Sequence, residues 1–126
     1  MSKNHISFIL HKPQLSENIG ACARAIKNFS FKKLILINPK PIFPNDKILA
    51  TSVGAKDIIT QSKKYDTLEQ ALGKIDIVIA TSARFRNKNI KHINLKDLEK
   101  INFNKKIGFL FGSEASGLSN EEISYA

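Results

Sequence analysis

Short apolar runs alternate along this chain with segments in which apolar residues recur at helical spacing, and this alternation limits the fold more than any other feature. The runs are almost wholly apolar, as in strands that are covered on both faces of a sheet. Alternating strands and helices predict an α/β fold, a mainly parallel sheet with helices on both faces. The predicted strands are residues 6–10, 33–37, 76–80 and 107–111.

The segments between these runs are predicted to be helical, and the pair Ile58-Ile59 is a candidate for a further short strand. Gly54 and Gly73 are expected to end two of the helices. The predicted helices are residues 17–29, 45–53, 65–72 and 95–100. The stripe expected to face the core in the first helix consists of Ile19, Cys22, Ala23, Ile26 and Phe29. A chain of 126 residues without a linker or an internal repeat predicts one domain.

The chain carries 20 basic and 11 acidic residues, a net charge of +9. Such an excess favours a polyanionic partner, either a nucleic acid or a membrane surface, over a surface that only promotes solubility. The cations are mostly lysine, so the three arginines, Arg24, Arg84 and Arg86, stand out. The planar guanidinium binds phosphate in a bidentate manner, which a lysine cannot do.

No apolar run approaches the roughly 20 residues of a membrane-spanning helix, and the first run is too short for a signal peptide. We therefore expect a cytoplasmic protein without a membrane partner. The single cysteine, Cys22, excludes an internal disulfide and is expected in the core. The three histidines, His5, His11 and His92, lack the spacing of metal ligands, so no metal site is expected.

Three connections follow predicted strands and carry candidate functional residues. Residues 11–18 lead into the helix with Arg24, residues 81–84 follow the third strand, and residues 112–118 contain two glycines and lead into a helix start. Ligands of open α/β sheets bind outside the carboxyl ends of the strands. If these strands are neighbours, the three loops crowd one rim of the sheet.

Each connection has a functional and a structural interpretation. One helix edge carries an i, i+4 row that consists of Ser16, Gly20, Arg24 and Asn28. This row could hold a phosphate or ribose beside the guanidinium of Arg24. Alternatively, Gly20 only packs closely against a neighbour and Arg24 is a surface residue. Residues 84–86 could bind RNA through Arg84 and Arg86, or be an ordinary loop. Glu114 could be a general base, a hydrogen-bond acceptor or a surface charge.

Together, these loops resemble the SpoU family of RNA ribose methyltransferases, within the SPOUT superfamily. Residues 18–25 with Asn28-Phe29 look like the family's first motif, and residues 111–118 look like its second. Residues 81–84 and 50–58 are most similar to the TrmJ-like branch, and the resemblance covers residues 6–124.

The resemblance implies methyl transfer from S-adenosylmethionine to a ribose 2′-hydroxyl of RNA. In the TrmJ-like branch the substrate is the first anticodon-loop nucleotide of tRNA, and rRNA is a further possible substrate. By position, Arg24 would be the catalytic arginine, Asn18 its motif partner, and Glu114 would shape the site. The residues expected to contact the RNA are Arg24, Arg84, Arg86 and Asn28. The implied cofactor contacts are Thr81, Ser82, Ala83, Gly112, Gly117 and Leu118. A homodimer is expected, because the family forms its active site between two copies.

The family's third motif, a Ser-Leu-Asn-type segment about twenty residues after the second, does not occur in this sequence. In the family it completes the adenosine pocket and forms the trefoil knot. The expectation is therefore a single SpoU-type domain over residues 1–126, a SPOUT-like α/β knot fold without its knot-forming segment, that binds the cofactor weakly. A catalytically incomplete RNA-binding module is the alternative. A different nucleotide-binding α/β protein is disfavoured, because no Gly-Lys-Ser/Thr phosphate loop is present.

Overall fold

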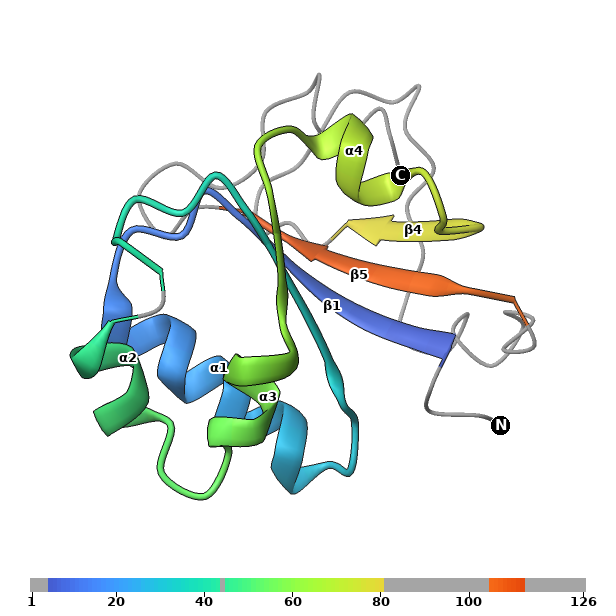
Figure 1. Ribbon diagram of the computed structural model, residues 1–126. Helices are drawn as coiled ribbons and strands as arrows, with labels where there is room; N and C mark the ends of the chain where they lie inside the picture. The colour runs from blue at the N-terminus through green and yellow to red at the C-terminus, as the bar shows by residue number, and fades with distance from the viewer. Residues whose placement is uncertain (1–4, 44, 81–104, 113–126) are drawn as a thin grey trace.

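The structure, a computed structural model, describes residues 5–43, 45–80 and 105–112. Its centre is a five-stranded sheet with the strand order β3-β2-β1-β5-β4 (Figure 1). Each pair of neighbouring strands is parallel, which confirms the predicted parallel sheet. The strands are β1 (Ile6–His11), β2 (Lys33–Ile37), β3 (Lys63–Tyr65), β4 (Ile77–Ala80) and β5 (Ile107–Phe111).

Helices cover both faces of the sheet, as predicted. Helices α1, α2 and α3 lie on one face, and α4 lies on the other (Figure 1). The helices are α1 (Ser16–Asn28), α2 (Asp46–Thr51), α3 (Lys56–Gln61) and α4 (Leu68–Leu72). The helix predicted at residues 95–100 lies outside the described residues.

The sheet separates two apolar clusters, and β2 contributes to both. Leu34 and Leu36 pack with α1, α2 and α3, whereas Ile35 and Ile37 pack with Leu68 of α4. Successive side chains of a strand point to opposite faces, so a wholly apolar run serves two cores at once. By contrast β4, at the edge of the sheet, is only half-buried along its length, although its sequence predicts a buried strand.

The prediction of a strand at Ile58-Ile59 is wrong, because both residues are buried on α3. An apolar pair does not distinguish a strand from a helix that packs one side against a core. The third strand is instead Lys63–Tyr65, and α4 begins at Leu68, after Thr67. Thr67 Oγ1 accepts a hydrogen bond from the backbone N–H of Gln70 (3.3 Å), which caps that helix.

Phe29 was expected on the apolar stripe of α1, but it is 70% exposed. The helix ends there, and Ser30 adopts a left-handed conformation with φ 65°. The backbone N–H of Phe31 then donates to the carbonyl of Ile26 (2.9 Å), as in a Schellman turn. Phe31 therefore takes the core position and meets Phe8 edge to face, at 5.2 Å between ring centroids.

Candidate functional site

The carboxyl ends of β1, β5 and β4 lie side by side at one edge of the sheet. Leu10 pairs with Phe111, and Leu110 pairs with both Ile9 and Ala80. The strand order therefore meets the condition under which the three connections crowd one rim. Of those connections, the structure describes residues 11–18 and Gly112, which is half-buried directly after β5.

Backbone hydrogen bonds hold the β1 and β2 part of this edge. Lys12 (φ 53°) donates its N–H to the carbonyl of Ile37 (2.7 Å), and Asn38 (φ 45°) donates to that of Tyr65 (2.8 Å). Lys40 then donates to the carbonyl of Pro13 (2.9 Å), which ties the two loops together. Each strand thus leaves the sheet through a left-handed residue, and the loop before α1 has a defined path.

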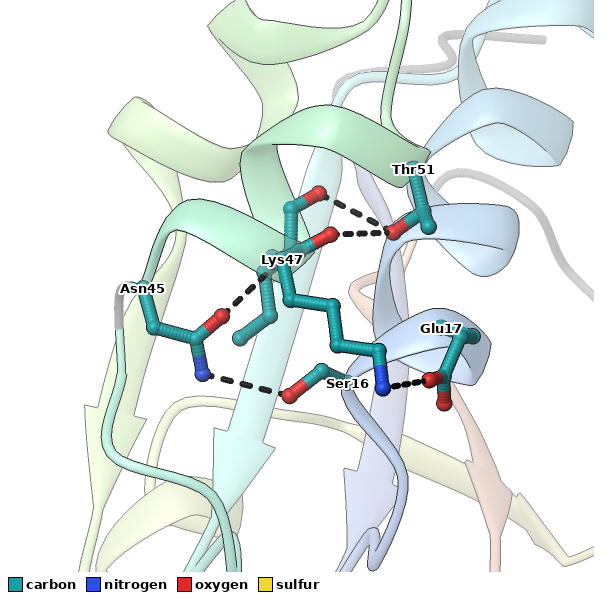
Figure 2. Close-up of polar contacts among 6 residues, drawn as sticks. Ser16, Glu17, Asn45, Lys47 and Thr51 are labelled. Atoms are coloured by element: carbon teal, nitrogen blue, oxygen red, sulfur yellow. Dashed lines mark hydrogen bonds and ion pairs between the residues drawn. The ribbon is translucent and has the colours of Figure 1, made fainter.

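The first turn of α1 is fixed by side chains at the start of α2 (Figure 2). Asn45 donates from Nδ2 to Ser16 Oγ (3.1 Å), while its Oδ1 accepts the N–H of Ile48 (2.8 Å) and caps α2. Lys47 forms an ion pair with Glu17. This ion pair lowers the pKa of the Glu17 carboxyl, chiefly through the side-chain hydrogen bond.

Gly20 of α1 lies close against Thr51 of α2. A Cβ at this position would be 2.0 Å from Thr51 Oγ1 and 2.9 Å from the carbonyl carbon of Thr51. The space beside Gly20 is thus filled by α2. Of the two interpretations of the i, i+4 row, the structure supports close packing for Ser16 and Gly20, which both face α2 and not a ligand.

Asn18, Arg24 and Asn28 are exposed on α1. Among the described residues, Arg24 has no ion-pair or hydrogen-bond partner, so its guanidinium is available to an anion. Arg24 is eight residues beyond Ser16, which places it about 12 Å along the helix axis from the first turn at 1.5 Å per residue. Arg24 therefore lies beyond the helix start that follows the end of β1, and Gly112 lies at the end of β5.

Most of the predicted cofactor contacts lie outside the described residues, as do two of the RNA contacts and one catalytic candidate. These residues are Thr81, Ser82, Ala83, Arg84, Arg86, Glu114, Gly117 and Leu118. Of the predicted site residues, the structure therefore describes Asn18, Arg24, Asn28 and Gly112.

Cys22 lies half-buried against the α1 side of the core, as its place on the apolar stripe predicts. Burial raises the pKa of its thiol to about 11. The thiol is therefore neutral at physiological pH and unsuited to act as a nucleophile.

A hollow of about 480 Å³ at the opposite, amino-terminal edge of the sheet was not singled out from the sequence. Its lining includes Lys33, Lys63 and Lys106. The signal that could have found it is a Lys-Lys pair at the start of three strands, at residues 32–33, 63–64 and 105–106.

Within the part of the chain that the structure describes, no helix is long and apolar enough to cross a membrane. In the same residues, no three side chains among histidine, cysteine, aspartate and glutamate are grouped as metal ligands would be.

The described fold resembles that of known RNA methyltransferases. TrmJ from Z. mobilis ZM4 superposes with a TM-score of 0.86 at 31% identity, over 95% of this chain and 55% of that one. The tRNA (cytidine-2′-O-)-methyltransferase TrmJ of Methanocaldococcus jannaschii is 38% identical over 123 residues, which is 94% of this chain and 53% of that protein. The tRNA (cytidine/uridine/adenosine-2′-O-)-methyltransferase TrmJ of Pseudomonas aeruginosa is 37% identical over 111 residues, or 84% of this chain and 43% of that protein.

The chain spans about half the length of the curated relatives that it matches. The family model of the SpoU rRNA methylases matches residues 5–126, which include the described sheet and its helices. With nearly the whole sequence matched, the chain belongs to the SpoU rRNA methylase family.

Proposed function

We propose that this chain is part of an enzyme that transfers a methyl group from S-adenosylmethionine to a ribose 2′-hydroxyl of tRNA. The observation that carries the proposal is the juxtaposition of the carboxyl ends of β1, β5 and β4, from which the first and second SpoU motifs and the Thr81-Ser82-Ala83 segment continue. The tRNA substrate is proposed because relatives at 37–38% identity are tRNA 2′-O-methyltransferases.

The cofactor is proposed to bind at the ends of β4 and β5. Gly112 is half-buried at the end of β5 and has no side chain, so a ligand can approach its backbone closely. The two strands end side by side, with Ala80 beside Leu110, and this supports a shared ligand at their ends. The proposed contacts are Thr81, Ser82, Ala83, Gly112, Gly117 and Leu118. When bound, the cofactor supplies an electrophilic methyl group on a sulfonium.

Arg24 is proposed to stabilise the developing negative charge of the ribose oxygen and to hold the adjacent phosphate. A guanidinium, with a pKa above about 12, does not act as a base, but its fixed positive charge favours an alkoxide. Its exposure and the absence of an ion-pair partner among the described residues suit this role. Asn18 and Asn28, exposed on the same helix, and Glu114 would position the RNA.

A homodimer is part of the proposal. Arg24 lies about 12 Å along α1 from Ser16, the first residue of that helix, and its exposed position leaves it accessible to a second copy. In a dimer, the exposed face of α1 in one copy would meet the strand ends of the other copy. The active site would then combine Arg24 from one copy with the cofactor edge of its partner.

The test is methylation by the protein produced from its natural gene. Labelled S-adenosylmethionine is supplied with unmodified tRNA or with rRNA, and the digested nucleosides are identified by mass spectrometry. The proposal predicts label in a 2′-O-methyl nucleoside from tRNA. Label on a base, or no transfer to either RNA, would contradict it.

A non-catalytic RNA-binding module is the second candidate, favoured by the net charge of +9 and the lysine pairs at the strand starts. The same experiment separates the two functions, because such a module binds tRNA without transferring the methyl group.

A further inference from the structure

Lysines stand at the amino-terminal starts of four of the five strands. Lys32-Lys33 leads β2, Lys63-Lys64 begins β3, Lys105-Lys106 precedes β5, and Lys74 precedes β4. All neighbouring strands are parallel, so these starts meet at one edge of the sheet. This edge is opposite the one proposed for methyl transfer.

Five of these seven lysines share a hollow of about 480 Å³, called here the amino-edge pocket. It lies between the starts of β1, β2 and β3 and the turn that follows α4. The five lysines that line it are Lys32, Lys33, Lys63, Lys74 and Lys106.

The pocket exists because α4 covers only part of its face of the sheet. Leu68 and Ala71 of this five-residue helix pack on Ile35 and Ile37. The register places Lys33 beside Ser7 and Lys63 beside Ile35, towards the starts of the strands. The pocket lining there combines the polar residues Ser7, Lys33 and Lys63 with the apolar residues Ile35, Ala71 and Ile75, and Ala71 belongs to α4, which borders the pocket.

The charges of the pocket are not balanced within the described structure. None of its described lining residues is acidic, and the described ion pairs, Lys27–Asp57 and Lys47–Glu17, lie elsewhere. The nearby carboxylate of Asp76 accepts the backbone N–H of Lys106 (3.0 Å) and forms no ion pair with a described lysine. Several cations that share a concave surface without counter-charges attract polyanions.

His5 also contributes to the pocket. It lines the pocket, and its Nδ1 is buried without a hydrogen-bond partner. Tyr65 and Gln61 also line the pocket and offer hydrogen-bond donors and an aromatic ring.

We propose that the amino-edge pocket binds the phosphodiester backbone of the RNA substrate, as a contact separate from the methyl-transfer site. The two sites lie at opposite ends of strands such as β1, whose six residues span about 20 Å at 3.3 Å per residue. An RNA that reaches both edges would be held in one orientation on the sheet. This inference rests on the proposed function, since it assumes that the substrate is RNA.

Lysines that flank apolar strands also protect against aggregation. That role requires only that they are exposed. It does not explain why five of them share one pocket whose described lining holds no acidic residue.

The test compares two double variants that remove the same charge. Lys33→Gln/Lys63→Gln removes two lysines from the pocket. The control, Lys56→Gln/Lys64→Gln, removes one lysine at the start of α3 and the neighbour of Lys63 that points to the other face of the sheet. A third variant, Lys33→Arg/Lys63→Arg, keeps the charge. Thermal unfolding checks that all of them fold, and fluorescence anisotropy measures the affinity for a fluorescein-labelled tRNA at several salt concentrations.

The proposal predicts that Lys33→Gln/Lys63→Gln weakens tRNA binding about 10-fold. It also predicts that the negative slope of log affinity against log salt becomes shallower by about 1.5 in this variant. Each lost phosphate contact reduces the magnitude of that slope by roughly 0.7–0.9. The control variant should change affinity less than about 2-fold, and the arginine variant should bind like the wild type.

Equal effects of the two glutamine variants would overturn the proposal, because binding would then depend on net charge alone. The same assay is run with fluorescein-labelled polyglutamate. If Lys33→Gln/Lys63→Gln loses polyglutamate binding but keeps tRNA binding, the proposal is also overturned, in favour of an acidic protein partner. A wild-type chain that does not bind tRNA would overturn both this inference and the proposed function. Wild-type binding that Lys33→Gln/Lys63→Gln leaves unchanged would overturn the inference alone.

Discussion

Gly20 of α1 lies so close to Thr51 of α2 that a Cβ on residue 20 would be 2.0 Å from Thr51 Oγ1. Thr51 is itself fixed, because Oγ1 donates to the carbonyl of Lys47 (2.9 Å) or that of Ile48 (3.2 Å) (Figure 2). The contact joins the helix that carries Arg24 to its neighbour. It explains a glycine in the middle of a helix, where glycine is otherwise unfavourable.

Gly20→Ala is therefore expected to lower the free energy of unfolding by roughly 1–3 kcal/mol, as over-packing does, although alanine is the better helix former. Thr51→Ala should rescue this variant only in part, because the Cβ and carbonyl carbon of residue 51 remain at 2.8 and 2.9 Å. Urea denaturation measures both. The matched control is Gly73→Ala, whose added Cβ would meet nothing closer than 3.8 Å and should cost no stability. A Gly20→Ala protein as stable as the wild type would contradict this account of the helix contact.

Ser30 holds a left-handed conformation (φ 65°) that costs a non-glycine residue about 1 kcal/mol. Ser30→Gly is expected to raise the free energy of unfolding by about 0.5–1 kcal/mol, because glycine adopts this conformation without strain. Ser30→Ala, which keeps a Cβ, should bring no such gain. Chemical denaturation at one pH compares the three proteins, and a Ser30→Gly protein less stable than the wild type would be the contrary result.

The thiol of Cys22 should react slowly in the folded protein. Burial raises its pKa from 9.0 to about 11, so the thiolate fraction at pH 8 falls about 100-fold, at tenfold for each pKa unit. Because this pKa is raised on folding, the stability that the neutral thiol contributes is present below pH 9 and is lost as the pH rises from 9.0 to about 11.

Alkylation by iodoacetamide, followed by mass spectrometry, checks this prediction, since the chain has one cysteine. The control places the thiol on the exposed neighbouring position, in Ala21→Cys/Cys22→Ala, which should react much faster. Equal rates for the two proteins would show that Cys22 is not protected.

Glu17 and Asp57 should contribute to stability at neutral pH and lose that contribution in acid. A side-chain hydrogen bond from Lys47 lowers the pKa of Glu17, and one from Lys27 (2.6 Å) lowers that of Asp57. Because folding lowers both pKa values, the stability is present above the unfolded values of 4.5 and 3.8 and is lost as pH falls through the folded ones.

A Glu17→Gln/Asp57→Asn protein is therefore expected to show a flatter decline of stability below about pH 5 than the wild type. Both pairs are exposed, so the difference should be small and should shrink in high salt. Asp66→Asn, which removes a carboxylate that forms no ion pair with a described residue, serves as the control. Thermal unfolding between pH 3 and pH 7 is the measurement, and identical pH profiles for the double variant and the wild type would be contradictory.

The strands that the sequence predicts well are those that need apolar side chains along their whole length, because both of their faces are covered. Residues 33–37 and 107–111 lie at central positions of the sheet, where both faces are covered, and their apolar runs reflect that. Lys63–Tyr65 was not predicted, because a three-residue edge strand needs few apolar side chains. Phe29 and Phe31 could not be assigned in advance, since their burial depends on where the left-handed turn at Ser30 ends the helix.

The candidate site was predictable only in part for a similar reason. The sequence indicates which residues follow strand ends, but not which strands are neighbours. The order β1-β5-β4 brings the carboxyl ends of the three strands together, and it depends on long-range packing. Gly20 shows the same limit: the choice between a ligand and a neighbouring helix depends on the position of Thr51, 31 residues later.

The central claim is that the guanidinium of Arg24 stabilises the methyl-transfer transition state, and Arg24→Lys tests it most directly. Lysine keeps the positive charge but lacks the planar fork, so tRNA affinity should stay within about 2-fold of the wild type. The single-turnover rate of methyl transfer, measured with saturating S-adenosylmethionine and the protein from its natural gene, should fall at least about 100-fold, as when one preorganised donor is removed. A rate in Arg24→Lys close to that of the wild type would contradict the account.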